Sequence, residues 1–127
     1  MEIVDETVIV VRQGTLATVV ADRARWRGWW PGLEATVVVD GGLDGLQWRL
    51  DGGLVGRAEV ALTPVREGVL LRYVLAADPA APGSRTAPRR LPDSPHGRRE
   101  LAALRRRHAL AWKAAVWSLK DELEAGA

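Results

Sequence analysis

Between residues 46 and 77 the sequence alternates apolar and polar side chains in three consecutive runs, and this alternation limits the folds open to the chain. The runs are Leu46–Asp51, Leu54–Thr63 and Val69–Ala77, and they are separated by Asp51-Gly52-Gly53 and by Pro64–Glu67. A period of two indicates strands with one buried face, and separators rich in Gly and Pro indicate hairpin turns. The segment therefore predicts an antiparallel meander with one dry face.

The lengths of the two separators predict a register. A three-residue loop at Asp51–Gly53 places Leu50 opposite Leu54 and Trp48 opposite Gly56, whose bare backbone the indole ring would cover. A four-residue loop at Pro64–Glu67 places Val60 opposite Leu71 and Glu59 opposite Arg72. A slip of one residue would exchange the two faces. Both hairpins agree on the residues of the dry face, which are Leu46, Trp48, Leu50, Leu54, Ala58, Val60, Leu62, Val69, Leu71, Tyr73 and Leu75.

The residues before this meander predict one strand, two short helices and another strand. Glu6–Val11 is short and rich in β-branched residues, which favours a strand. From about Gln13 the apolar spacing becomes helical, and a second helix is expected over Asp22–Trp30, with Asp22 as its N-cap and Pro31-Gly32 as its stop. Ala35–Asp40 predicts the next strand, closed by a Gly-Gly turn.

The last third of the chain predicts a loop followed by a long helix. Residues 79–96 are rich in proline and are expected to form an irregular loop. From Pro95 or Gly97 to Ala125 the pattern is helical, and its apolar stripe consists of Leu101, Leu104, His108, Ala111, Trp112, Ala115, Leu119 and Leu123. This stripe must be buried, and the dry face of the sheet is the only large apolar partner. Residues 1–127 are therefore expected to form a single α+β domain.

Composition excludes several classes of protein. The chain has no cysteine, which excludes disulfides, thiolate metal ligands and cysteine nucleophiles. The first residues, MEIVDE, are acidic where a secretory signal would be basic, and no apolar stretch approaches the ~20 residues of a membrane span. A cytoplasmic location is the expectation from these features.

The order of the elements resembles the START-like (SRPBCC) superfamily, and within it the actinobacterial polyketide cyclase/dehydrase and lipid-transport-like proteins. The resemblance depends on Val19–Asp22, Arg25-Trp26 and the segment WWPGL at 29–33, and it extends through the later strands to Trp112–Leu123. It implies a helix-grip fold, in which an antiparallel sheet wraps a long C-terminal helix and two short helices follow the first strand. The family's sheet usually has six strands between the short helices and the last helix, whereas the sequence predicts four. One hairpin is therefore expected to be missing, with a narrower sheet and a smaller or more open cavity.

The family uses its interior cavity for hydrophobic ligands and has no universal catalytic residue. By resemblance, the candidates for a ligand-binding cavity here are Trp30, Trp48, Tyr73, Leu104, His108 and Trp112. The alternative is that these six side chains simply fill the core. The resemblance implies a small polyketide-like or lipid-like ligand and no cofactor. It leaves open whether a cyclase or dehydratase reaction takes place.

His108 is the one candidate for acid–base chemistry, because the pKa of a histidine lies near neutrality. The alternative is a hydrogen-bonded core histidine. His96 is expected to be solvated in the proline-rich loop, and two histidines a dozen residues apart without a nearby acid do not predict a metal site. No serine lies in a Gly-x-Ser-x-Gly turn, and no glycine cluster has the dinucleotide-binding pattern.

Arginines gather in Arg85–Arg107, which holds eight of them against Asp93 and Glu100. Such a segment can contact nucleic acid, an anionic surface or an acidic partner. It lacks interleaved aromatics and a helix-turn-helix pattern, which disfavours nucleic acid, and a solvated helix face explains the run more simply. A further alternative is a non-enzymatic module in which the shortened sheet leaves an exposed edge or apolar patch for a homodimer.

Overall fold

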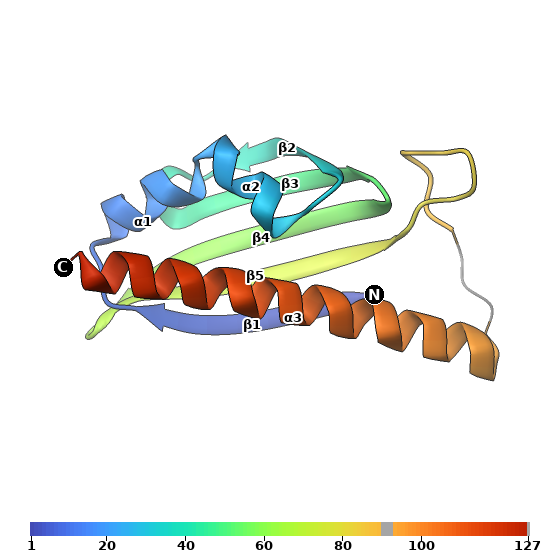
Figure 1. The fold of residues 1–127 in the computed structure, drawn as a ribbon. Coiled ribbons are helices and arrows are strands. Elements are labelled where there is room, and N and C mark those ends of the chain that lie inside the picture. Colours follow the sequence, from blue (N-terminus) through green and yellow to red (C-terminus); the bar gives the residue numbers. More distant parts are fainter. Residues whose placement is uncertain (90–92, 127) are drawn as a thin grey trace.

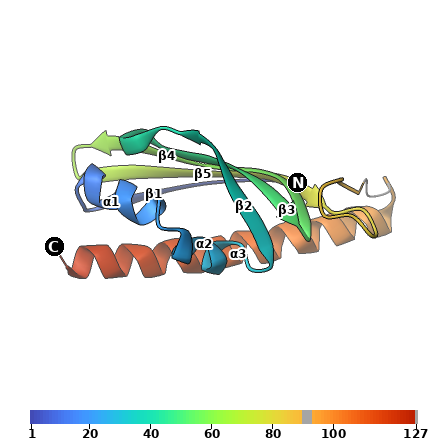
Figure 2. The same ribbon diagram turned by 90° about the horizontal axis from the view of Figure 1, so that it is seen from above.

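The computed structural model describes residues 1–89 and 93–126 and shows one five-stranded sheet with its helices on one face (Figures 1 and 2). In chain order the elements are β1 (Glu2–Ile9), α1 (Gln13–Val20), α2 (Arg23–Trp29), β2 (Leu33–Asp40), a single 3-10 turn (Gly42–Asp44), β3 (Gly45–Gly52), β4 (Leu54–Val65), β5 (Gly68–Pro79) and α3 (Pro95–Ala125). This is the predicted α+β helix-grip architecture, with two short helices after the first strand and four strands between α2 and α3.

The sheet is antiparallel throughout, with the strand order β1-β5-β4-β3-β2. The chain leaves β1 at one edge and returns through α1 and α2 to β2 at the other edge, after which three hairpins fill the middle. Figure 2 shows α3 running along the face that also carries α2. All eleven side chains predicted for the dry face are buried there.

The predicted register is wrong by two residues in both central hairpins, although the faces are right. Trp48 pairs with Ala58 and Leu50 with Gly56, while Val60 pairs with Tyr73. A shift of two leaves every side chain on the same face, because the side-chain period along a strand is also two. Gly56 is therefore not covered by Trp48. A Cβ at Gly56 would instead lie 2.2 Å from the carbonyl oxygen of Ala76, so close strand approach requires glycine.

The β4–β5 turn is shorter than predicted because Pro64 lies inside a strand. Pro64 pairs with Val69, which leaves only Arg66 and Glu67 in the turn. Pairing between β3 and β4 ends at Ala61, so Pro64 lies where β4 has a free side. A proline is tolerated at such an edge because no neighbour needs its missing N–H.

The longer hairpin also changes one predicted charge pair. Glu59 pairs with Val74 rather than with Arg72. The Arg72 guanidinium instead lies 3.7 Å from the carboxylate of Glu6 on β1.

Several element boundaries differ from prediction. β1 begins four residues earlier than the predicted Glu6–Val11 and ends at Ile9. The proline-rich loop is shorter than 79–96, because Pro79 ends β5 and Pro95 begins α3, which places His96 in the first helical turn. Residues 90–92, including Arg90 of the arginine-rich segment, lie outside the described residues. The two short helices have the predicted positions, and Asp22 caps α2 by accepting a hydrogen bond from the Ala24 amide at 3.1 Å.

The C-terminal half of α3 is bound firmly to the rest of the domain. Trp112, Val116 and Leu119 are its buried apolar side chains, whereas Ala111 of the predicted stripe is exposed. Arg25 of α2 forms two hydrogen bonds with Glu122, at 2.8 and 2.9 Å, and the Val10 amide donates to Glu124 at 3.0 Å. Figure 1 shows the first turns of α3 extending past the N-terminus, where β1 begins.

Asp5 of β1 is the main polar anchor for the middle of α3. Its carboxylate accepts hydrogen bonds from Trp112 Nε1 at 3.2 Å, from Thr7 Oγ1 at 3.0 Å and from Lys113 Nζ. Burial alone would raise the pKa of Asp5, but the hydrogen bonds and the charge of Lys113 outweigh it, so the pKa lies below its usual value.

Acid should therefore weaken the fold through Asp5. Because the pKa is lower in the folded state, the stabilising contribution is present at neutral pH and is lost as the pH falls below about 4 and through the folded-state pKa. Asp5→Asn should lower the free energy of unfolding at pH 7 by about 1–2 kcal/mol. Urea denaturation at a series of pH values from 7 to 3 measures the free energy of unfolding of both proteins. The difference between Asp5→Asn and the parent should become smaller as the pH falls. Glu6→Gln, at an exposed neighbouring carboxylate, is the control, and a difference for Asp5→Asn that stays constant with pH would contradict the assignment.

Candidate ligand pocket

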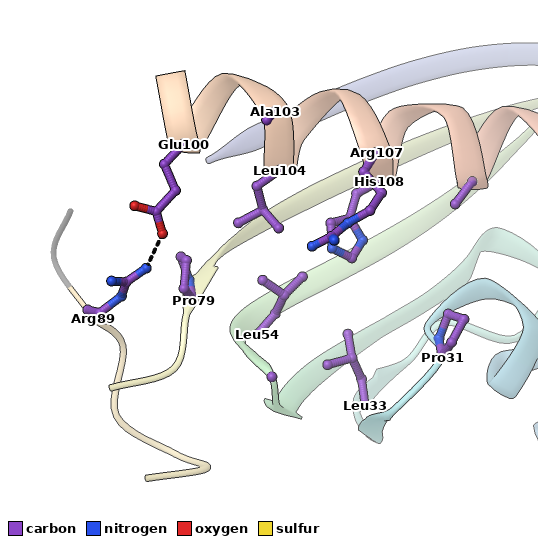
Figure 3. A pocket seen from close by; sticks show the side chains of 12 residues that line it. Pro31, Leu33, Leu54, Pro79, Arg89, Glu100, Ala103, Leu104, Arg107 and His108 are labelled. Atoms are coloured by element: carbon purple, nitrogen blue, oxygen red, sulfur yellow. Dashed lines mark hydrogen bonds and ion pairs between the residues drawn. The ribbon is translucent and has the colours of Figure 1, made fainter. Parts of the chain in front are cut away.

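A cavity of about 840 Å³ lies under the N-terminal half of α3, at the end of the sheet where the β3–β4 turn and the end of β5 meet (Figure 3). It is open to solvent on one side. Its walls come from the α2–β2 turn, β2, the β3–β4 turn, the start of β4, the end of β5, the proline-rich loop and α3. The lining residues are Pro31, Leu33, Gly53, Leu54, Pro79, Arg89, Glu100, Ala103, Leu104, Arg107, His108 and Ala111.

Most of the lining is apolar. Leu33 and Leu54 form the sheet side of the cavity, and Leu104 faces them from α3 (Figure 3). Leu33 is placed by the Pro31-Gly32 turn, in which Gly32 has φ +75°, a conformation that favours glycine. Leu54 is the first residue of β4 and directly follows Gly53. The cavity therefore has three leucines converging from three different elements.

The proline-rich loop is fixed against the sheet ends at this site. The Gly52 amide donates to the carbonyl of Arg85 at 2.9 Å, and the Ala80 amide donates to the carbonyl of Gly53 at 3.0 Å. Arg89 then reaches Glu100 of α3, with 2.5 Å between guanidinium and carboxylate. Figure 3 shows this ion pair at one end of the pocket and Pro31 at the other.

The central polar groups of the pocket are Arg107 and His108, both on α3. His108 is half-buried. Burial, and secondarily the charge of Arg107, lower the pKa of His108 below its usual value, so the imidazole is neutral at pH 7. A neutral imidazole can donate through one ring nitrogen and accept through the other. The pocket therefore contains a neutral imidazole that can both donate and accept a hydrogen bond.

The structure places the six predicted site residues in two adjacent groups. Leu104 and His108 line the cavity. The other four, Trp30, Trp48, Tyr73 and Trp112, are at most 2% exposed and pack against one another beside the cavity, where Trp30 and Trp112 are the chain neighbours of the lining residues Pro31 and Ala111. The ring centroids of Tyr73 and Trp112 are 3.8 Å apart in a stacked pair, and those of Trp30 and Trp48 are 5.0 Å apart. A role of these four in ligand binding stays a prediction.

This aromatic cluster, completed by Trp26 and Trp29, is held by one internal hydrogen bond. Trp30 Nε1 donates to the Tyr73 hydroxyl at 2.9 Å. Burial raises the pKa of Tyr73 to about 12, although the hydrogen bond from Trp30 opposes the shift, so the phenol stays protonated. Trp48 Nε1 is buried and has no hydrogen-bond partner among the described residues. The indole of Trp48 packs instead against the rings of Trp26 and Trp29, whose centroids lie 5.5 and 6.4 Å from its own.

Sequence reasoning missed most of the sheet-side lining and Arg107. Leu54 was assigned to the dry face, but nothing in its pattern distinguishes a pocket wall from a core position. The sequence identifies Pro31 as part of a helix stop and of the WWPGL segment, and Leu33 only as part of that segment. Arg107 lies three residues after Leu104 and next to His108, so helical spacing from those two candidates would have found it.

Within residues 1–89 and 93–126, no three histidine or acidic side chains come together as a metal site would require. The same residues include no helix that is both long and apolar enough to cross a membrane.

No protein-family model matches the sequence, and no curated protein is significantly similar to it. Solved structures do match in shape over nearly the whole chain. The Deinococcus radiodurans protein DR_A0006 superposes with a TM-score of 0.67 at 13% identity, covering 100% of both chains.

Two further solved structures match this chain over nearly its whole length. The Aha1 dimer of Colwellia psychrerythraea has a TM-score of 0.64 at 13% identity, covering 99% of this chain and 98% of that one. The polyketide-cyclase-like protein Cgl2372 of Corynebacterium glutamicum has a TM-score of 0.50 at 15% identity, covering 98% and 94%. At these identities the likeness shows a shared fold.

Proposed function

We propose that this chain, which has the START-like helix-grip fold, binds a small apolar molecule in the pocket under the N-terminal half of α3. The observation that supports it is the contrast between two neighbouring regions. The interior beside α2 is filled by packed tryptophans, whereas Leu33, Leu54 and Leu104 face an unfilled space of about 840 Å³. Concave, largely apolar sites with a few polar groups are the usual form of small-molecule sites.

The driving force for binding would be burial of apolar surface. Removing about 300 Å² of ligand surface from water yields about 7 kcal/mol at ~25 cal/mol per Å². Part of that is lost to the entropy of association, so we expect dissociation constants in the micromolar range or weaker.

Binding is the core of the proposal, and any turnover would have to involve His108. A cyclase or dehydratase reaction needs a group that accepts or donates a proton, and His108 is the neutral base that lines the pocket. The carboxylate of Glu100 also lines it but is engaged by Arg89.

A fluorescent probe tests the proposed pocket directly. N-phenyl-1-naphthylamine is neutral and apolar, and its emission should rise on titration with the protein. Ala111→Trp should weaken its binding at least tenfold, because the exposed Ala111 lines the pocket and a ring there would occupy it.

Ala114→Trp is the matched control, since Ala114 is exposed on the same helix and does not line the pocket. Circular dichroism should show both variants folded. An absence of binding, or equal affinity for the parent and Ala111→Trp, would contradict the proposal.

The second candidate function is self-association through the outer face of α3. Leu110 and Trp117 are 60% and 50% exposed, and a spacing of seven residues places them on one side of the helix. The similar Colwellia structure is a dimer. Sedimentation velocity over a range of concentrations separates the two functions, because only self-association predicts a dimer that Trp117→Gln dissociates.

A further inference from the structure

The charges that line the pocket do not cancel. Arg89 and Glu100 form an ion pair and neutralise each other. Arg107 also lines the pocket, and among the described residues no carboxylate lies within ion-pair distance of it. His108 is neutral at pH 7. The lining therefore has one uncompensated positive charge.

Arg107 differs in this respect from several other arginines of the chain. Arg25 is paired with Glu122, and Arg98 with Asp93. Arg105 donates to the carbonyl of Glu2 at 3.0 Å. Arg107 lines the pocket beside His108, and its charge adds to the effect of burial in lowering the pKa of that histidine.

A neutral apolar ligand would displace water from part of this guanidinium and would offer no hydrogen-bond acceptor in its place. Such uncompensated desolvation of a charge is unfavourable. An anionic group on the ligand would remove that cost. The planar guanidinium donates two parallel hydrogen bonds to a carboxylate, which makes arginine well suited to this head group.

We propose that the ligand is an amphipathic monoanion, with its apolar body against Leu33, Leu54 and Leu104 and its carboxylate bound by Arg107. This rests on the proposed function, because it assigns a head group to the ligand of the same pocket. A polyanion bound along the arginine-rich segment is the competing explanation, and three of that segment's arginines are already engaged, by Glu100, by Asp93 and by the backbone carbonyl of Glu2.

Two probes with the same aromatic skeleton test the head group. 8-Anilinonaphthalene-1-sulfonate is the sulfonated counterpart of N-phenyl-1-naphthylamine, so the pair differs only in the anionic group. Arg107→Gln should weaken binding of the sulfonate about fivefold, which is the upper end of the range for an exposed ion pair. It should change the affinity for the neutral probe less than twofold. Arg106→Gln, at an exposed arginine that does not line the pocket, should change neither.

Competitors extend the test to carboxylates. Decanoate should displace the neutral probe from the parent at lower concentration than 1-decanol does. Arg107→Glu should reverse the preference, so that decyltrimethylammonium displaces the probe better than decanoate. Inorganic phosphate and a DNA oligonucleotide should displace nothing.

The outcomes separate this proposal from the one on which it rests. If the neutral probe fails to bind the parent, the pocket itself is not a ligand site. If the neutral probe binds and Ala111→Trp blocks it, but Arg107→Gln leaves the sulfonate unaffected, the pocket stands and the anionic head group is wrong. If Arg106→Gln and Arg107→Gln lost equal affinity for the sulfonate, or if DNA displaced the neutral probe, the effect would be due to the general charge of the arginine-rich segment.

Discussion

Trp48→Ala is expected to lower the free energy of unfolding by about 3–5 kcal/mol, the usual loss for a fully buried tryptophan. Trp48 is 0% exposed and its ring is in edge contact with Trp26, Trp29 and Trp30. Its removal takes away contact with all three rings and leaves a cavity that the rigid indoles cannot close. For a domain of this size the melting temperature should fall by roughly 10–20 °C.

Trp117→Ala is the matched control, because Trp117 lies on the surface of α3 with 50% of its area exposed. It should change the free energy of unfolding by less than about 1 kcal/mol. Urea denaturation followed by far-ultraviolet circular dichroism avoids the change in tryptophan fluorescence that both variants bring. Similar losses in the two variants would show that the aromatic cluster is not the centre of the core.

Gly45→Ala should cost about 3 kcal/mol or more through a backbone clash rather than a cavity. Gly45 has φ +114°, which L-residues rarely adopt, and a Cβ there would lie 1.9 Å from the carbonyl oxygen of Val60. Adding one carbon would force β3 away from β4 at the end of their pairing, because Gly45 lies opposite Ala61.

Gly28→Ala provides a control of opposite sign. Gly28 lies inside α2, and a Cβ there would meet nothing within 4 Å. Alanine should stabilise the domain by about 0.5–1 kcal/mol, because it favours the helix and restricts the unfolded chain. Thermal unfolding of the two variants should give shifts in opposite directions. A Gly45→Ala variant as stable as the parent would show that this strand end can move aside.

The arrangement of faces could be predicted from the sequence because alternation of side chains determines it. The eleven predicted dry-face residues are all buried, and α3 packs on that face through Trp112. The register could not be predicted, because residue preferences do not determine the length of a turn. Proline favours a turn, but Pro64 is paired with Val69 inside β4. It is tolerated there because pairing with β3 ends at Ala61 and leaves that side of β4 free.

The helix-grip fold that the resemblance implies is confirmed, and the structure has the predicted four strands between α2 and α3. The pocket was harder to predict than the fold. A buried side chain in a packed core and one in a cavity wall have the same sequence pattern. The sequence therefore could not show that Trp30 and Trp48 lie in the packed cluster while Leu104 lines the cavity. The location of the cavity depends on where the α2–β2 turn and the start of β4 meet α3, and these are long-range contacts.

The side-chain period of two along each strand has a consequence for how such hairpins change length over evolution. A strand that gains or loses two residues within its paired part keeps each later side chain on its original face, whereas a single insertion there would exchange the two faces unless a bulge absorbed it. β2 has such an irregularity between Val37 and Val39. Homologues of this domain should therefore differ by even numbers in the length of their paired strands, and odd differences should coincide with bulges.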